Sequence, residues 1–256
     1  MLRMLWNSKS AMMAQQEKLD SIANNISNSS TDGYKRTDVS FKDLMQESLK
    51  KEGYPTAQNN ANGLLTGIGV KTGQWTRDDT QGSLIDTGFS TDIALDGAGF
   101  LKVILSNGNS AYTRNGSFSL GSDGSLNDKS GNRLEILLNG NQVKVPSSNF
   151  KIDTLGNVTD KSSGKDIIIG KVKLYDFTGT DGMVSIGNSL FAPKNGVNSY
   201  EPTNTSIRQG FVEASNVDIA KEMADMIITQ RAFELSSKGL KTADDMWAMA
   251  NNLKSK

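Results

Sequence analysis

The sequence contains neither cysteine nor histidine among its 256 residues. Without cysteine it has no disulfide framework, no thiolate nucleophile and no zinc-thiolate site. Without histidine it lacks the usual general base near neutral pH and the commonest metal ligand, so the standard Ser-His-Asp and Cys-His arrangements are impossible. Only carboxylate or Ser/Lys chemistry stays open. We therefore expect a protein that is not an enzyme, with no catalytic residue, no metal site and no cofactor.

An excess of charge of either sign is also absent. Lys and Arg together number 28, as do Asp and Glu, so the formal net charge is zero. Binding to nucleic acid requires a cationic surplus that neutralises phosphates, and nucleic acid is therefore not expected as a partner. Zero net charge instead allows identical subunits to associate without repelling one another as whole bodies.

Long hydrophobic runs are missing as well. The N-terminal sequence MLRMLWNSKSAMMAQQ is interrupted by Asn7, Ser8 and Lys9 before an apolar segment can form. This pattern does not fit a Sec-type signal peptide, and no run has the length of a membrane-spanning helix. If the protein works outside the cytoplasm, we expect it to leave by a route that needs no cleaved signal of this kind.

Both ends of the chain show a seven-residue apolar repeat. Residues 1 to about 28 carry Leu5, Met12, Leu19 and Ile26 at this spacing, with Ile22 beside them, which predicts an amphipathic helix that Thr31-Asp32-Gly33 ends. Residues 217 to 253 carry the longer row Ile219, Met226, Phe233, Leu240 and Trp247, with Met223 beside it. Five repeats of one heptad position are typical of a coiled-coil seam.

Local signals mark the start and a weak point of the second helix. Ser215 and Asn216 are good N-cap residues, and Ser215 with Asp218 resembles a capping box. Gly239 costs about 1 kcal/mol relative to alanine. Because the heptad row continues beyond it, we expect the helix to continue too.

The centre of the chain follows a different pattern. Of the 25 glycines, 22 lie between Gly63 and Gly210, many of them in Asn-Gly or Asp-Gly pairs such as Asn107-Gly108 and Asn115-Gly116. These dipeptides favour tight hairpin turns, and the short runs between them alternate apolar and polar residues. The pattern predicts an antiparallel all-β domain of the sandwich or barrel type.

The predicted fold class is therefore α+β, with terminal helices that pair as a coiled-coil-like bundle and a central antiparallel all-β domain. We expect four segments. Residues 1–33 form the N-terminal helix, 34–75 a partly extended connection, 76–210 the β domain and 211–256 the C-terminal helix. Within the connection, residues 41–49 suggest a short helical turn and 58–69 an extended polar stretch.

The simplest partner for each terminal seam is the other one, within the same chain. The two helices differ in length, however, and together expose more apolar surface than one two-helix contact covers. Met13, Ile227, Ile228, Met246 and Met249 lie on the remaining faces and are expected to contact neighbouring subunits. Identical subunits in head-to-tail contact form rings or open filaments.

Six sequence blocks resemble the family of flagellar rod and hook proteins. The N-terminal signature is similar in residues 23–28 (ANNISN) and 31–35 (TDGYK). Residues 213–218 (EASNVD) resemble the family's entry to the C-terminal helix, and 230–234 (QRAFE) its C-terminal pattern. Two central blocks, 92–100 (DIALDGAGF) and 111–118 (AYTRNGSF), are similar too. Leu5-Trp6, residues 67–70 and the length most resemble the distal-rod branch, with the proximal-rod branch as the alternative.

The resemblance implies a structural subunit of the bacterial flagellar basal body. Such subunits stack helically, with paired terminal helices around a central channel and the β domain outside, and the rod transmits torque to the hook. They are exported unfolded through the flagellar type III apparatus without a cleaved signal, to an extracytoplasmic location. Expected partners are copies of the same chain, neighbouring rod and hook proteins and the export apparatus, with no small-molecule substrate.

Assembly should then depend on the two seams and on the Asn-rich stretch after the first. This stretch has two interpretations, as a helix end and turn or as a polar network that fixes the register between subunits. The predicted interface residues are Leu5, Met12, Leu19, Ile22, Asn24, Asn25, Ile26, Asn28, Ile219, Met223, Met226, Phe233, Leu240 and Trp247.

Two alternatives from other functional classes stay open at this point. A carbohydrate-binding or adhesin-like β module would need an exposed aromatic platform on the β domain. A carboxylate-dependent glycosidase would need two carboxyl groups that face one cleft. Neither explains why both ends of the chain carry matched heptad rows.

Overall fold

The computed structural model describes residues 2–44, 46–49, 64–67, 69–138, 140–145, 149–160, 167–179 and 182–254. The chain divides into two compact units. The helical unit comprises Met1–Ser27, Thr37–Thr76 and Asp218–Lys256, and the β unit comprises Asn28–Arg36 and Arg77–Val217. The predicted α+β class, with paired terminal helices and a central antiparallel β region, is confirmed.

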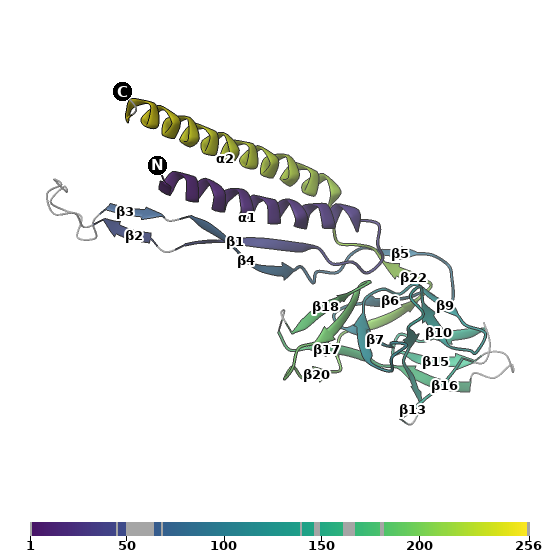
Figure 1. The fold of residues 1–256 in the computed structure, drawn as a ribbon. Coiled ribbons are helices and arrows are strands. Elements are labelled where there is room, and N and C mark those ends of the chain that lie inside the picture. The colour runs from purple at the N-terminus through teal and green to yellow at the C-terminus, as the bar shows by residue number, and fades with distance from the viewer. Residues whose placement is uncertain are drawn as a thin grey trace. The chain divides into compact units, whose positions relative to one another are not determined.

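The helical unit contains two long helices, α1 (Leu2–Ser27) and α2 (Ile219–Lys254), which lie side by side along their lengths (Figure 1). As predicted, α2 passes through Gly239 without a break. Strand β1 (Thr37–Asp43) packs against α1 and pairs with β4 (Val70–Arg77). Strands β2 (Gln46–Leu49) and β3 (Leu64–Gly67) form an antiparallel pair. Neither described helix has the length and apolar character needed to cross a membrane.

The helical turn expected at residues 41–49 is wrong, because this stretch contains the end of β1 and the whole of β2. The strand partner of β1 lies about 30 residues further along the chain, in β4, and local periodicity cannot reveal such a partner. Part of the stretch 58–69 that was expected to be extended lies outside the described residues. The domain boundaries at residues 33, 75 and 210 stay predictions, although Thr37–Thr76 groups with the two helices.

The start of α2 also differs from the prediction. Asp218 is the N-cap, since its Oδ1 atom accepts hydrogen bonds from the backbone N–H groups of Ala220 (2.9 Å) and Lys221 (3.3 Å). Its negative charge suits the positive end of the helix dipole. Ser215 and Asn216, which were expected to cap the helix, lie before this residue and bind other groups.

Two larger sheets make up most of the β unit, and its described strand pairings are antiparallel. The nine-stranded sheet contains β7 (Phe100–Ile104), β8 (Ser110–Thr113), β9 (Phe118–Leu120), β10 (Leu126–Asp128), β11 (Arg133–Leu134), β17 (Leu174–Phe177), β18 (Met183–Gly187), β19 (Leu190–Pro193) and β20 (Ser199–Tyr200). The five-stranded sheet has the order β13 (Asn141–Gln142), β12 (Ile136–Leu138), β16 (Ile167–Val172), β15 (Asn157–Asp160) and β14 (Phe150–Ile152).

Two shorter strand pairs complete the β unit. Strand β21 (Ser206–Gln209) pairs with β6 (Ile93–Asp96), and β22 (Phe211–Glu213) pairs with β5 (Leu84–Asp86). These pairs place the last strand before α2 beside strands that come more than 100 residues earlier in the chain. The segment that leads into α2 is therefore fixed by pairings that are distant in sequence.

The core of the β unit is apolar and contains the alternating residues that the sequence predicted. Ile93, Leu95, Leu101, Val103 and Val172 belong to one buried cluster. A second cluster is mainly aromatic. Its buried members are Phe100, Tyr112, Phe177, Met183 and Phe191. Its rings meet edge to face, for example Tyr112 and Phe177 at 4.7 Å between centroids.

Two of the predicted Asn-Gly turns have different roles. Gly108, between β7 and β8, has a φ of +82°, which is the left-handed conformation that such a hairpin needs. Gly116 does not have a positive φ, so the turn expected there is wrong. A Cβ atom at Gly116 would lie 1.8 Å from the carbonyl oxygen of Ile93. Glycine is needed there because two backbone segments approach each other closely.

Candidate assembly surface

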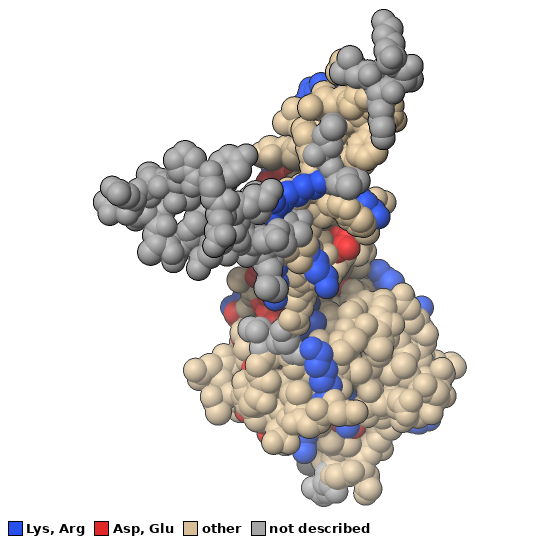
Figure 2. All heavy atoms as spheres, turned by 60° about the vertical axis from the view of Figure 1, so that its left-hand side comes forward, with Lys and Arg blue, Asp and Glu red and all other residues tan. Residues whose placement is uncertain are grey.

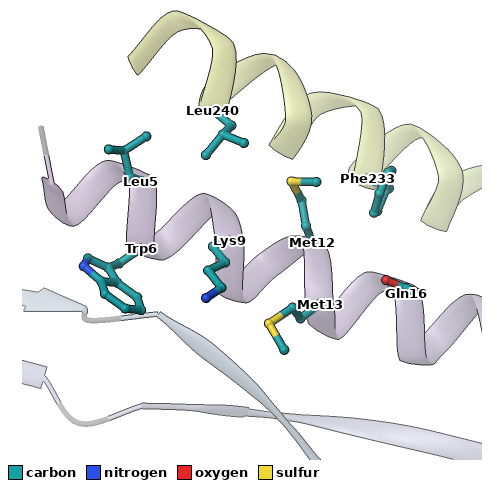
Figure 3. A pocket seen from close by; sticks show the side chains of 8 residues that line it. All are labelled: Leu5, Trp6, Lys9, Met12, Met13, Gln16, Phe233 and Leu240. Carbon is teal, nitrogen blue, oxygen red and sulfur yellow. The ribbon is translucent and has the colours of Figure 1, made fainter. Parts of the chain in front are cut away.

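The contact between α1 and α2 places apolar side chains opposite one another. Leu5 lies near Leu240, and Met12 lies near Phe233 (Figure 3). The most deeply buried row on α2 is a neighbouring one, however, with Glu222, Thr229 and Ala243 at the same heptad position and the half-buried Ser236 between the last two. The sequence prediction missed this row because it followed apolar residues alone. Small and polar side chains allow two helices to approach closely, and apolar side chains then flank the contact.

The predicted interface residues divide into three groups by burial. Ile22 and Asn25 are buried within the chain. The half-buried residues are Leu5, Met12, Leu19, Ile26, Asn28, Met226, Phe233 and Leu240. The exposed residues are Asn24, Ile219, Met223 and Trp247. Contact with neighbouring subunits stays a prediction for all of them.

Asn25 ties α1 to β1 and to α2 within the helical unit. Its Nδ2 atom donates to the carbonyl oxygen of Thr37 (2.8 Å) and to Oε2 of Glu222 (3.2 Å). Its Oδ1 atom accepts from the backbone N–H of Thr37 (2.9 Å), so the amide binds Thr37 as a neighbouring strand would. Ser21 Oγ also donates to the Thr37 carbonyl (2.8 Å). Asn25 thus joins a network inside one chain, while α1 ends at Ser27 and Asn28 lies in the turn that follows. A role of the Asn-rich stretch between subunits stays a prediction.

An open apolar groove of about 480 Å³ is lined by residues of both helices (Figure 3). Phe233 and Leu240 of α2 form one part of its lining. The residues from α1 are Leu5, Trp6, Lys9, Met12, Met13 and Gln16. Trp6 and Met13 are 62 % and 57 % exposed although both are large and apolar. The Nζ atom of Lys9 lies 5.3 Å from the centre of the Trp6 ring, a cation–π distance.

The outer surface of α2 carries further exposed apolar side chains. Ile227, Ile228 and Leu235 are each at least 60 % exposed. Met13, Ile227, Ile228, Met246 and Met249, which the sequence placed on uncovered faces, are all exposed. Large apolar side chains exposed along one helix make that helix a candidate contact site.

In the β unit, three charged residues from different sequence blocks form a buried cluster. Glu213 on β22 is fully buried. Its Oε1 atom accepts from Lys35 Nζ (2.5 Å) and from the backbone N–H of Gly82 (3.0 Å), while Oε2 accepts from Arg114 Nη1 (3.1 Å). The guanidinium of Arg114 also lies over the Phe100 ring, 5.4 Å from its centre. A buried carboxylate needs such partners, because an unpaired charge in the interior is costly.

The surroundings of Lys35 affect its charge in two opposite ways. Burial lowers the pKa of Lys35 from 10.5, and the nearby carboxylate of Glu213 partly opposes this change. Lys35 Nζ also donates to the Thr80 carbonyl (2.8 Å). Asn216 holds the same loops together, since its Oδ1 atom accepts from the Arg36 N–H (2.7 Å) and its Nδ2 atom donates to the carbonyls of Asp78 and Thr80.

This cluster brings together one charged residue from each of three sequence blocks. Lys35 belongs to the block TDGYK, Arg114 to AYTRNGSF and Glu213 to EASNVD. Sequence reasoning quoted all three blocks but did not connect them. The available signal was the presence of charged residues in all three blocks, and only the folded structure shows that Lys35, Arg114 and Glu213 meet. The cluster fixes the segments that leave α1 and lead into α2.

The described residues of the β unit do not favour the carbohydrate-binding alternative. All three tryptophans, Trp6, Trp75 and Trp247, lie outside the β unit. Among its described residues, the large exposed aromatic side chains are Phe89 and Tyr200, which lie on separate elements. An aromatic platform for a sugar is therefore not formed by the described part of this unit.

The glycosidase alternative finds two carboxylates near one cavity, but both are already bound. Asp79 and Asp176 line a cavity of about 310 Å³. Asp79 pairs with Arg77 Nε (2.5 Å), and Asp176 accepts from the Tyr200 hydroxyl (2.8 Å). Lys35 and Arg114 line the same cavity, so it mixes both signs of charge. Within the described residues, no group of three or more acidic side chains could hold a metal ion.

Charged side chains of both signs lie among uncharged residues on the face drawn in Figure 2, where Lys and Arg are more prominent than Asp and Glu.

Comparison with known families gives three matches along the chain. Residues 208–253 match the family described as flagellar basal body rod FlgEFG protein C-terminal. Residues 94–160 match the flagellar hook protein FlgE/F/G D1 domain, and residues 5–35 match the flagella basal body rod protein family. These matches include both helices and the first part of the β unit.

Full-length relatives are similar over nearly the whole chain. The flagellar basal-body rod protein FlgG of Borreliella burgdorferi is 35 % identical, with 99 % of each chain covered. FlgG of Buchnera aphidicola subsp. Acyrthosiphon pisum is 36 % identical, covering 96 % of this chain and 97 % of the relative. FlgG of Bacillus subtilis is 31 % identical, covering 99 % of this chain and the whole relative.

Proposed function

This chain belongs to the flagellar basal-body rod family as a structural subunit of the distal-rod type, and we propose that it polymerises helically through its two terminal helices. The family is structural and non-enzymatic, its place is the basal-body rod, and it assembles with rod and hook proteins. Full-length relatives named FlgG favour the distal branch over the proximal one.

The proposal rests mainly on the apolar surface that the helix pair leaves exposed. Burying one Ile, Leu or Met side chain contributes about 1.5–3 kcal/mol. Ile227, Ile228 and Leu235 together therefore offer several kcal/mol to a contact with another subunit. Because these residues lie outside the contact between α1 and α2, folding of the single chain does not cover them. If these residues contact copies of the same chain, the helices form the axial part of a rod that transmits torque.

Export through the flagellar type III apparatus is the proposed route out of the cytoplasm. Two observations support it: the family's location in the basal-body rod and the N-terminal pattern, which does not fit a Sec-type signal peptide. A secretion assay in a strain without the export apparatus tests this proposal. Appearance of the protein outside the cytoplasm of such a strain would contradict it.

Deletion of the gene followed by electron microscopy of purified basal bodies tests the place of the subunit. We expect basal bodies that end just beyond the proximal rod and carry no hook. Complete rods in the deletion strain would contradict the proposal.

A charge on the outer face of α2 tests the role of the helices. Ile228→Glu should leave the fold of the monomer intact, because Ile228 is 65 % exposed, but it should prevent assembly. Gln230→Glu places the same charge at an exposed polar position on another side of the helix and should assemble normally. Rods of equal length with both variants would show that this face is not an assembly surface.

A further inference from the structure

One helix of the helical unit extends beyond the other at one end of the pair. α2 has 36 residues and α1 has 26, so α2 is longer by about 15 Å at 1.5 Å per residue. The pairs Leu5 with Leu240 and Met12 with Phe233 show that the helices run antiparallel (Figure 3). In this register, α1 ends close to the first residues of α2. The excess length therefore lies at the C-terminal end of α2.

We call residues 244–252 of α2 the overhang. Ala243 is fully buried, and every residue from 244 to 252 is exposed. Trp247 continues the heptad row of Phe233 and Leu240, and Met246 lies beside it on the same side of the helix. Trp247 and Met246 are 41 % and 47 % exposed. The overhang thus continues the seam of the helix pair without a partner helix from its own chain.

The groove described above has the complementary properties. Its lining is almost entirely apolar, with Trp6 and Met13 exposed along one wall. Lys9 provides a positive charge in this lining. Asp244, exposed beside the apolar side of the overhang, provides a negative charge. A helix with an apolar side and a flanking carboxylate fits a groove of this composition.

We propose that the overhang of one subunit docks into the groove of another copy of the same chain. Trp247 and Met246 then contact Trp6 and Met13, and Asp244 approaches Lys9. The contact joins two different surfaces of identical subunits, so it does not close on itself and continues from copy to copy. This inference rests on the proposed function and specifies which surfaces of the helices would meet.

The overhang cannot reach the groove of its own chain. By the register of the helix pair, Met13 lies opposite a residue near 232 on α2. Ala250 is 18 residues further along the same helix, which corresponds to about 27 Å. Two cysteines can form a disulfide only when their Cα atoms are less than about 7 Å apart. A disulfide between positions 13 and 250 must therefore join two copies.

Disulfide formation in assembled rods tests the proposal, since the natural chain contains no cysteine. The double variant Met13→Cys with Ala250→Cys should give a ladder of covalent multimers when basal bodies are oxidised and run on a non-reducing gel. The control Gln230→Cys with Ala250→Cys places the first cysteine at an exposed polar position outside the groove and should give at least fivefold less product. Equal yields from both pairs would overturn the proposal.

A charge exchange tests the pair of Lys9 and Asp244 in the same cysteine background. Lys9→Glu should lower the yield of multimers several-fold, and adding Asp244→Lys should restore it. If adding Asp244→Lys to Lys9→Glu lowers the yield of multimers further, Lys9 and Asp244 do not pair.

The failure of this docking is distinguishable from the failure of the proposed function. If the double-cysteine subunit is present in complete basal bodies but gives no multimers, the docking is wrong and the rod assignment stands. Multimers that contain a different rod protein instead of a second copy would also overturn the docking. If the subunit is missing from basal bodies altogether and its deletion leaves complete rods, the rod assignment itself is wrong.

Discussion

At the scale of single residues, Glu213 has the most demanding environment in the β unit. It is fully buried and accepts hydrogen bonds from two cationic side chains, Lys35 and Arg114, and from the backbone N–H of Gly82. A buried ion pair contributes little compared with an apolar core, but removing one partner leaves the others uncompensated. Lys35 and Arg114 therefore depend on this carboxylate for their burial.

Replacing Glu213 with glutamine should strongly destabilise the β unit. The change keeps the size of the side chain but leaves two buried cations without this carboxylate. We expect the free energy of unfolding to fall by about 3–5 kcal/mol. Glu201→Gln is the matched control, because Glu201 pairs with Lys171 at the surface, where both side chains are well exposed. The control should lose less than about 1 kcal/mol. Chemical denaturation measures both variants, and similar losses would show that the cluster does not stabilise the unit.

Asp123 should make stability depend on pH in the acid range. Hydrogen bonds from the Oγ and N–H groups of Ser125 lower the pKa of Asp123 from 3.8 to about 2. Because the folded pKa lies below the unfolded one, the stabilisation is present above about pH 4 and is lost as the pH falls to about 2. Asp123→Asn should melt at a lower temperature than the natural chain at pH 7, with a difference that shrinks towards pH 2. A difference that is constant with pH would exclude this role.

At the scale of elements, the packing of α1 on β1 depends on a side-chain amide that forms the same hydrogen bonds as the backbone of a neighbouring strand. Asn25 binds both the N–H and the carbonyl of Thr37, and it also reaches Glu222 on α2. Three elements of the helical unit therefore meet at one amide group.

Asn25→Ala should lower the free energy of unfolding of the helical unit by about 1–3 kcal/mol, because polar groups of Thr37 and Glu222 lose this partner. Asn24→Ala removes the neighbouring amide, which is exposed, and should have a smaller effect. Loss of helical circular dichroism on heating measures both variants. If the two variants have the same melting temperature, the network around Thr37 does not hold these elements together.

Local patterns in the sequence were sufficient to predict the elements whose information is local. Both helices follow from their heptad rows, including the passage through Gly239. The hairpin at Gly108 follows from its dipeptide. What failed depended on partners distant in sequence. Strand β1 pairs with β4, and Gly116 is fixed by the backbone of Ile93.

The candidate surface was predictable in part for the same reason. The apolar rows identified which helices pair, but the buried row of Glu222, Thr229 and Ala243 does not look like a seam when only apolar residues are followed. Glu222 is buried because Asn25 binds it from the other helix. A sequence without its partners gives no reason to place a glutamate inside.

At the scale of the whole molecule, the two units differ in how much core each possesses. Among the described residues, the buried apolar side chains of the helical unit are Ala14, Ile22, Val39 and Ala243. The remaining buried apolar residues belong to the β unit, which contains both hydrophobic clusters. Apolar burial is the main favourable contribution to folding, so the helical unit should be much the less stable unit in an unassembled chain.

Limited proteolysis of the purified, unassembled chain should therefore cut within both terminal helices first. The expected product is a resistant fragment made of residues 28–36 and 77–217, identified by its mass, because the segment 37–76 between them belongs to the helical unit. The buried pair of Lys35 and Glu213 should keep the first segment of this fragment attached to its last strand. In assembled rods the same protease should leave the helices intact, because contact with neighbouring subunits would then cover Ile227, Ile228 and Leu235. Helices that resist proteolysis equally in both states would mean that the small core of the helical unit is sufficient, and that its exposed apolar surface is not what drives assembly.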